Sequence, residues 1–173
     1  MKRLKLAGLV VDIGVVRFRF LVILVASPLV LLPTPVADAR SSKTLDIKVL
    51  SVVHTYAQND LEPKGLSSGD RITSTDRLYN LVPQFGKPTG ALIGSDSGTF
   101  TVRTGKAADF RGIARLPGGT IMVRGRLLLG SARSTLAVVG GTGRFSKARG
   151  TVSVTTVNAS KGLARNVFRL TLP

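Results

Sequence analysis

The sequence contains no cysteine, no tryptophan and one histidine among its 173 residues. Without cysteine the chain forms neither disulfide bonds nor thiolate metal sites, so its stability must come from its core and from assembly. A single histidine also excludes a histidine-rich metal site and argues against a Ser-His-Asp catalytic triad. We therefore expect no metal site, and we expect no cofactor.

Acidic residues are scarce as well, with nine Asp and Glu against 25 Lys and Arg, which gives a net charge of +16. Such a charge favours contact with anionic surfaces. The basic residues are spread along the chain rather than gathered in runs, and this favours a solvated basic exterior over a specific nucleic-acid groove. A hydrophobic content of 43% with 19 glycines and 5% aromatic residues indicates a globular chain with many turns and slim strands.

The first 39 residues differ in composition from the rest. An uncharged apolar run at 20–32 is followed by two prolines and Ala37-Asp38-Ala39, and it is preceded by Lys2, Arg3, Lys5, Arg17 and Arg19. This order is typical of a secretory signal peptide. The run is shorter than the ~20 apolar residues that a spanning helix needs, although a retained membrane anchor is the alternative. We expect a signal peptide at 1–39, a single domain at 40–173 with a net charge of +13, and a secreted or extracytoplasmic location.

From Leu45 onward the sequence consists of short β-prone runs separated by Gly, Pro, Asn, Asp and Ser. Leu45, Ile47 and Val49 alternate with polar residues, which places them on one face of a strand, and the alternation slips after Val49, which indicates a bulge or burial on both faces. Further strands are predicted at 70–80, 87–94, 99–104 after a turn at 95–98, 109–116, 120–126, 134–139, 151–157 and 163–172.

Eight or nine short strands with tight turns and no crossover helix predict an all-β, antiparallel sandwich or closed barrel. Pro117-Gly118-Gly119 is a strong hairpin signal within this pattern. Closure into a barrel removes exposed edge strands, and an eight-stranded barrel leaves room inside for side chains or one small ligand. Gly140-Gly141-Thr142-Gly143 lacks the lysine and the strand-to-helix context of a phosphate loop, so we interpret it as a tight β connection.

Several motifs carry a family resemblance. The segments 116–121 (LPGGTI), 137–145 (AVVGGTGRF) and 148–150 (ARG), with Gly69-Asp70 and 75–80 (TDRLYN) upstream, resemble the allene oxide cyclase and dirigent barrel superfamily. The resemblance covers roughly 49–172. It implies an eight-stranded antiparallel closed barrel with an apolar interior pocket, assembled as a homotrimer or homodimer.

The resemblance also implies positions for site residues. Asp76 stands where the cyclases carry an asparagine that holds a water molecule, Phe100 stands at their cysteine position, and Arg149 matches the dirigent arginine. We expect Asp76, Tyr79, Arg149 and His54 to be polar pocket residues and candidate catalytic groups. Asp70 and Asp76 are six residues apart, so period two places them on the same side as a like-charge pair, unless Asp70 caps a turn and only Asp76 faces inward.

Two functions follow from these features. In the first, an exported dirigent-like or cyclase-like barrel binds a small apolar ligand and steers its cyclisation or coupling. The sequence leaves open whether this barrel is an enzyme; if it is one, we expect an isomerase-like enzyme without a cofactor. In the second, a non-catalytic basic barrel binds envelope or extracellular polyanions through outward side chains such as Arg124, Arg126 and Arg169.

The leader yields the first testable prediction. If residues 1–39 are a signal peptide, N-terminal sequencing of the protein recovered outside the cytoplasm should begin at or near Arg40. A chain that begins at Met1 in the membrane fraction would refute cleavage and support the retained anchor.

Overall fold

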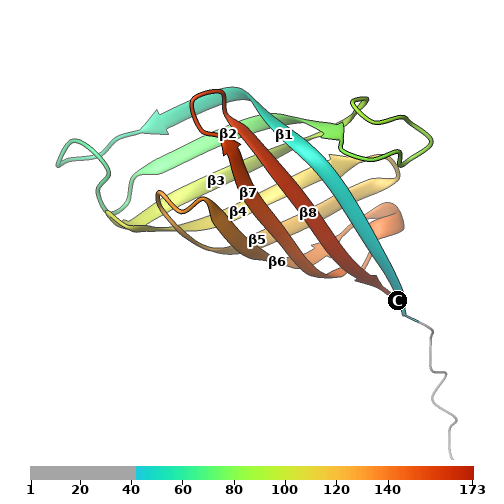
Figure 1. Cartoon of the computed structure of the whole chain (residues 1–173). Coiled ribbons are helices and arrows are strands. Elements are labelled where there is room, and N and C mark those ends of the chain that lie inside the picture. The colour runs from blue at the N-terminus through green and yellow to red at the C-terminus, as the bar shows by residue number, and fades with distance from the viewer. Residues whose placement is uncertain (1–41) are drawn as a thin grey trace, which may run out of the picture. The chain divides into compact units, whose positions relative to one another are not determined.

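The computed structural model describes residues 42–173, which form a closed antiparallel barrel of eight strands in sequential order (Figure 1). The predicted fold class is confirmed. The strands are β1 (Lys43–Asn59), β2 (Arg71–Asn80), β3 (Leu92–Thr104), β4 (Ala107–Leu116), β5 (Gly119–Leu128), β6 (Arg133–Gly141), β7 (Arg149–Asn158) and β8 (Leu163–Leu172), with a 3-10 turn, η1 (Gly143–Phe145), between β6 and β7.

The first and last strands close the barrel. β1 pairs with β8 from Lys43 opposite Leu172 to Val52 opposite Leu163. On its other side β1 pairs with β2, and the register shifts between Val53 and Thr55. The strand is therefore irregular at this later point, whereas the alternation of faces continues past Val49, since Ser51 is buried as well.

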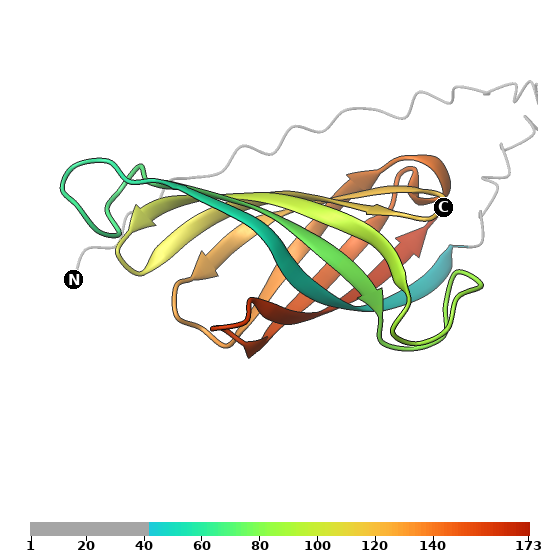
Figure 2. The ribbon, with the colours of Figure 1, turned by 90° about the horizontal axis from the view of Figure 1, so that it is seen from above.

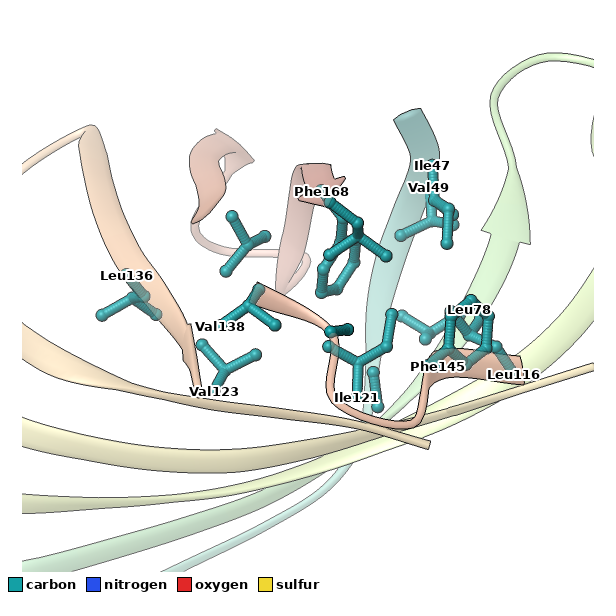
Figure 3. Packing of buried hydrophobic residues seen from close by; sticks show 14 of the residues in the cluster. Ile47, Val49, Leu78, Leu116, Ile121, Val123, Leu136, Val138, Phe145 and Phe168 are labelled. Carbon is teal, nitrogen blue, oxygen red and sulfur yellow. The ribbon is translucent and has the colours of Figure 1, made fainter. Parts of the chain in front are cut away.

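The loops alternate between the two ends of the barrel (Figures 1 and 2). One end, the closed end, carries the β2–β3, β4–β5 and β6–β7 connections. The other, the open end, carries the β1–β2, β3–β4, β5–β6 and β7–β8 connections. Buried apolar side chains from all around the sheet fill the interior toward the closed end, where Phe145 of η1 is fully buried (Figure 3). Complete burial of a large apolar side chain stabilises a fold by roughly 1.5–3 kcal/mol.

Two of the glycine motifs interlock at the closed end. The Arg144 amide donates to the Gly118 carbonyl at 2.8 Å. Gly143 has a φ of 58°, and a Cβ atom there would lie 2.1 Å from the Gly118 oxygen. The glycine is required by a left-handed conformation and a close backbone approach. The hairpin is confirmed. The tight connection is confirmed only at Gly143, because Gly140 and Gly141 belong to β6 and do not have a positive φ.

The prediction for β3 was wrong in one respect. Residues 87–94 are mostly loop, and 95–98 are not a turn but the middle of a continuous strand, paired with β2 and β4. Gly98 is a packing glycine, because the Phe110 ring lies against it and a Cβ atom would be 2.5 Å from that ring. Glycine within a strand often marks such an approach rather than a turn.

The predicted signal segment at 1–39 lies outside the described residues. Within residues 42–173 there is no helix of sufficient length and apolarity to span a membrane.

Candidate ligand cavity

A cavity of about 370 Å³ occupies the barrel interior toward the open end. Leu129, Gly130 and Ser131 of the β5–β6 connection line it, and so do the exposed side chains of Tyr56 and Leu128, so the cavity reaches the surface. Most of its wall is apolar, from Val53, Ile72, Phe100, Phe110, Ile113, Val123, Leu127, Leu136, Val152, Val154 and Phe168. The volume lies in the range of about 300–1,000 Å³ found for small-molecule sites.

Two phenylalanines shape one wall. The ring centroids of Phe100 and Phe110 are 4.7 Å apart with planes tilted by 49°. Phe110 lies over Gly98 and Gly112, and a Cβ atom on Gly112 would come within 2.7 Å of its ring. The ring can therefore occupy this position only because neither glycine has a side chain.

Four polar residues of the cavity come from strands β1, β2, β3 and β8, and Ser74, Ser97, Ser131, Ser134 and Thr156 also line it. Ser51 Oγ donates to Asp76 Oδ2 at 2.7 Å, and Asp96 lies directly opposite Asp76 in the β2–β3 pairing. Asn166 is 7% exposed. Asp76 Oδ1 and Asn166 Oδ1 are buried without a hydrogen-bond partner among the described residues. These four residues are named here the polar floor.

Asp96 is the electrostatically unusual member of the polar floor. Burial, and secondarily the negative charge of Asp76, raise the pKa of Asp96 to about 7. No hydrogen bond from the described residues stabilises its charged form. A carboxyl in such surroundings carries its proton at mildly acidic pH and loses it near neutrality. Groups poised in this way inside a cavity are candidates for functional residues.

Of the predicted site residues, Asp76 lies in the cavity wall. Asp70 does not join it. Its carboxylate accepts the backbone N–H groups of Leu61 and Ser67, both at 2.8 Å, and these bonds lower the pKa of Asp70. Asp70 thus holds the β1–β2 loop while Asp76 faces inward, and the like-charge partner of Asp76 is Asp96 instead.

The other three predicted residues are not among those that line the cavity. Tyr79 lies between the buried residues Leu78 and Asn80, so its side chain points to the outer face of β2. His54 is exposed, with Nε2 at 3.5 Å from Arg77 Nη2.

Arg149 is exposed at the closed end, where its Nη1 donates to the carbonyls of Val139 and Ala148, both at 2.9 Å. The structure therefore brings none of them together with Asp76.

Sequence reasoning missed Ser51, Asp96 and Asn166. Ser51 continues the inward series of Ile47 and Val49, and Asn166 continues that of Leu170 and Phe168. Period two alone would have found both. Asp96 was hidden because Ser95-Asp96-Ser97-Gly98 has the composition of a turn.

Within residues 42–173 no three His, Cys, Asp or Glu side chains gather into a group that could hold a metal ion.

Comparisons with known proteins agree with this architecture. The family model described as dirigent-like protein matches residues 80–172. No curated protein sequence matches the chain significantly.

Solved structures of similar fold belong to proteins with different activities. Pyocyanin demethylase is 21% identical with a TM-score of 0.61, covering 73% of this chain and 99% of its own. A pterocarpan synthase dirigent protein is 19% identical with a TM-score of 0.57, covering 75% and 84%. The Diels-Alderase AbmU from Streptomyces koyangensis is 23% identical with a TM-score of 0.59, covering 76% and 64%. At these identities the likeness shows the fold.

The raised pKa of Asp96 predicts how stability depends on pH. Between pH 3.8 and about 7 the folded chain keeps a proton that the unfolded chain releases, so stability falls as pH rises through this window, by at most about 1.4 kcal/mol per pH unit. Asp96→Asn should remove this fall. Denaturant unfolding from pH 4 to pH 8 should show the variant increasingly more stable than the parent as pH rises.

Asp109→Asn is the control for this measurement. Asp109 lies on the outer face, and its ion pairs with Arg103 and Arg126 lower its pKa, so its contribution is lost at acidic pH, the opposite direction. Parallel pH profiles for Asp96→Asn and the parent would show that Asp96 is ionised in the folded chain throughout this range.

Proposed function

The chain belongs to the dirigent-like protein family, and from this premise we propose that its barrel binds a small apolar molecule in the cavity and steers its cyclisation or coupling. The observation that carries the proposal is the cavity itself, whose extended apolar wall is interrupted by a small number of polar groups, among them the polar floor. An apolar site with a few placed polar groups is the usual design of a small-molecule site. The fold neighbours include pterocarpan synthase dirigent proteins and Diels-Alderases.

Steering in such a site requires that one end of the ligand be fixed while the rest is folded against a rigid wall. The apolar wall, including Phe100 and Phe110, limits the conformations that the ligand body adopts, which brings reacting atoms together without an added reagent. The polar floor fixes the polar end, and Ser51 holds the Asp76 carboxylate in one orientation. A carboxylate there also stabilises positive charge that develops on the ligand during ring closure.

Export remains part of this proposal. The basic leader, the apolar run and the small-residue cleavage pattern of the sequence support it, and the N-terminal sequencing described above tests it.

A second candidate function rests on the outer surface of the barrel. Exposed arginines gather on the outer face of β2–β5 and are named here the arginine face: Arg71, Arg103, Arg111, Arg124 and Arg126. Arg111 and Arg124 lie directly opposite each other on paired strands. Like charges at such positions destabilise the strand pair. Asp109 is the acid among them and pairs with Arg103 at 2.7 Å. A linear polyanion such as an acidic polysaccharide is the partner that this surface fits.

The ligand proposal is tested by filling the cavity. Ala164 lines it, so Ala164→Phe should occupy the space of the ligand and reduce the affinity for a neutral apolar probe, naphthylethanol, by at least about tenfold, or about 1.4 kcal/mol. Ala137→Phe makes the same change on the exposed outer face of β6 and should leave affinity unchanged. Fluorescence titration measures both.

Native mass spectrometry of the protein from its producing cells complements the titration and should show a bound small molecule in the parent and in Ala137→Phe. Equal probe binding by Ala164→Phe and the parent would overturn the cavity as the site. Absence of any bound molecule, together with no binding across apolar cyclic compounds, would overturn the proposed function.

The arginine face predicts salt-dependent retention on heparin. Retention should depend on salt, because the Debye length shortens from about 10 Å at 0.1 M to about 3 Å at 1 M. Arg111→Ser with Arg124→Ser removes two positive charges from the arginine face, so the double variant should elute at a clearly lower salt concentration. Arg133→Ser with Arg165→Ser removes the same charge from exposed positions on β6 and β8 and should have a smaller effect. Equal shifts for the two pairs would reduce the interaction to net charge and refute a defined surface.

A further inference from the structure

The cavity has the opposite charge to the exterior of the barrel. The chain is strongly basic, yet the described residues that line the cavity include Asp76 and Asp96 and no lysine, arginine or histidine. The two carboxyls lie directly opposite each other on β2 and β3. Like charges at opposed positions destabilise a strand pair, and here no basic side chain of the wall offsets them. The cavity wall therefore contains no positive charge, although its two carboxyl groups would stabilise one.

The polar floor also contains hydrogen-bond acceptors that have no donor. Ser51 satisfies one oxygen of Asp76, whereas the other oxygen, Oδ1, is buried without a donor. Asn166 Oδ1 is also buried without a donor, on a residue that is 7% exposed and lines the cavity. A buried acceptor without a donor costs about 1–3 kcal/mol. The polar floor thus leaves two buried oxygen acceptors without a donor.

These features discriminate among classes of ligand. A carboxylate or phosphate would meet two acidic groups and no basic one, so anions are excluded by repulsion. A neutral hydrocarbon would leave the surplus acceptors unpaired. A molecule with a protonated nitrogen supplies both the donor and the charge, and such charge-assisted hydrogen bonds are about twice as strong as neutral ones.

We infer that the cavity takes an apolar molecule that carries a positively charged nitrogen, with the nitrogen seated on the polar floor between Asp76, Asp96 and Asn166. The inference rests on the proposed function and names the chemical class of its ligand: an amine or a cationic ring rather than a fatty acid, a phosphate or an uncharged terpene-like hydrocarbon. The apolar wall accommodates the body of the molecule, and the wall's lack of basic residues gives selectivity against anions.

Binding of such a cation is coupled to proton release. The titratable group that faces Asp96 is Asp76 on β2, whereas its neighbour in the β4 pairing is Ala114. Ser51 and Asn166 are uncharged, and Tyr56, the remaining titratable side chain of the wall, is 60% exposed with its hydroxyl bonded to Gln58. A bound cation favours the ionised form of Asp96, so affinity rises with pH up to about 7, by at most tenfold per pH unit.

The test uses three probes with one naphthalene body: naphthylethylammonium, naphthylethanol and naphthylacetate. Dissociation constants for the full-length protein are measured at pH 5.5 and pH 8.5 by fluorescence titration. The ammonium probe should bind at least tenfold more tightly at pH 8.5 than at pH 5.5, and at pH 8.5 at least tenfold more tightly than the alcohol. The alcohol should show no dependence on pH, and the acetate should bind most weakly.

Asp96→Asn preserves side-chain volume and should abolish the pH dependence of ammonium binding, whereas Asp109→Asn on the outer face should retain it. Ammonium and alcohol probes that bind equally at both pH values would overturn the inference and leave the proposed function standing, and so would a pH dependence that survives in Asp96→Asn. Failure of all three probes to bind would instead count against the proposed function.

Discussion

Pairing of β1 with β8 is the constraint on which the rest of the molecule depends. Ten residue pairs, from Lys43 with Leu172 to Val52 with Leu163, convert a meander of hairpins into a closed wall. Once the wall is closed, the alternation of side chains divides every strand into an inward and an outward set. The inward set fills the closed end with apolar side chains and leaves the cavity toward the open end, so core and cavity are two parts of one interior.

The same division separates the charges of the chain. Arginines such as Arg111 and Arg124 occupy outward positions, where water solvates them, while Asp76 and Asp96 occupy inward positions of neighbouring strands. A basic protein thereby encloses an acidic floor. Net charge alone predicts affinity for anions, yet the interior has the electrostatics of a site for cations, and only the register of the strands distinguishes the two.

Much of this arrangement is predictable from sequence, because turn chemistry and period-two alternation are local properties. The hairpin at Pro117-Gly118-Gly119, the tight connection at Gly143 and the inward position of Asp76 are of this kind. The opposition of Asp76 and Asp96 is not, because it depends on strand register between two residues that are 20 positions apart in the sequence. The Ser95–Gly98 segment has turn-forming residues, and only the packing of Phe110 against Gly98 shows why a glycine belongs within a strand there. Tyr79 and Arg149 were assigned by motif alone, and motif position does not specify which face of the sheet a side chain occupies.

The glycines beneath Phe110 have a consequence for how such a barrel diversifies. Gly98 and Gly112 leave the space in which the ring lies, so a methyl group at either position would turn the ring and change the outline of the cavity without altering a single polar group. In the proposed ligand site, shape and charge are therefore determined by different residues on the same wall. A lineage could exchange one ligand skeleton for another through small changes at these two positions while retaining its charge preference, which makes the site evolvable in independent steps.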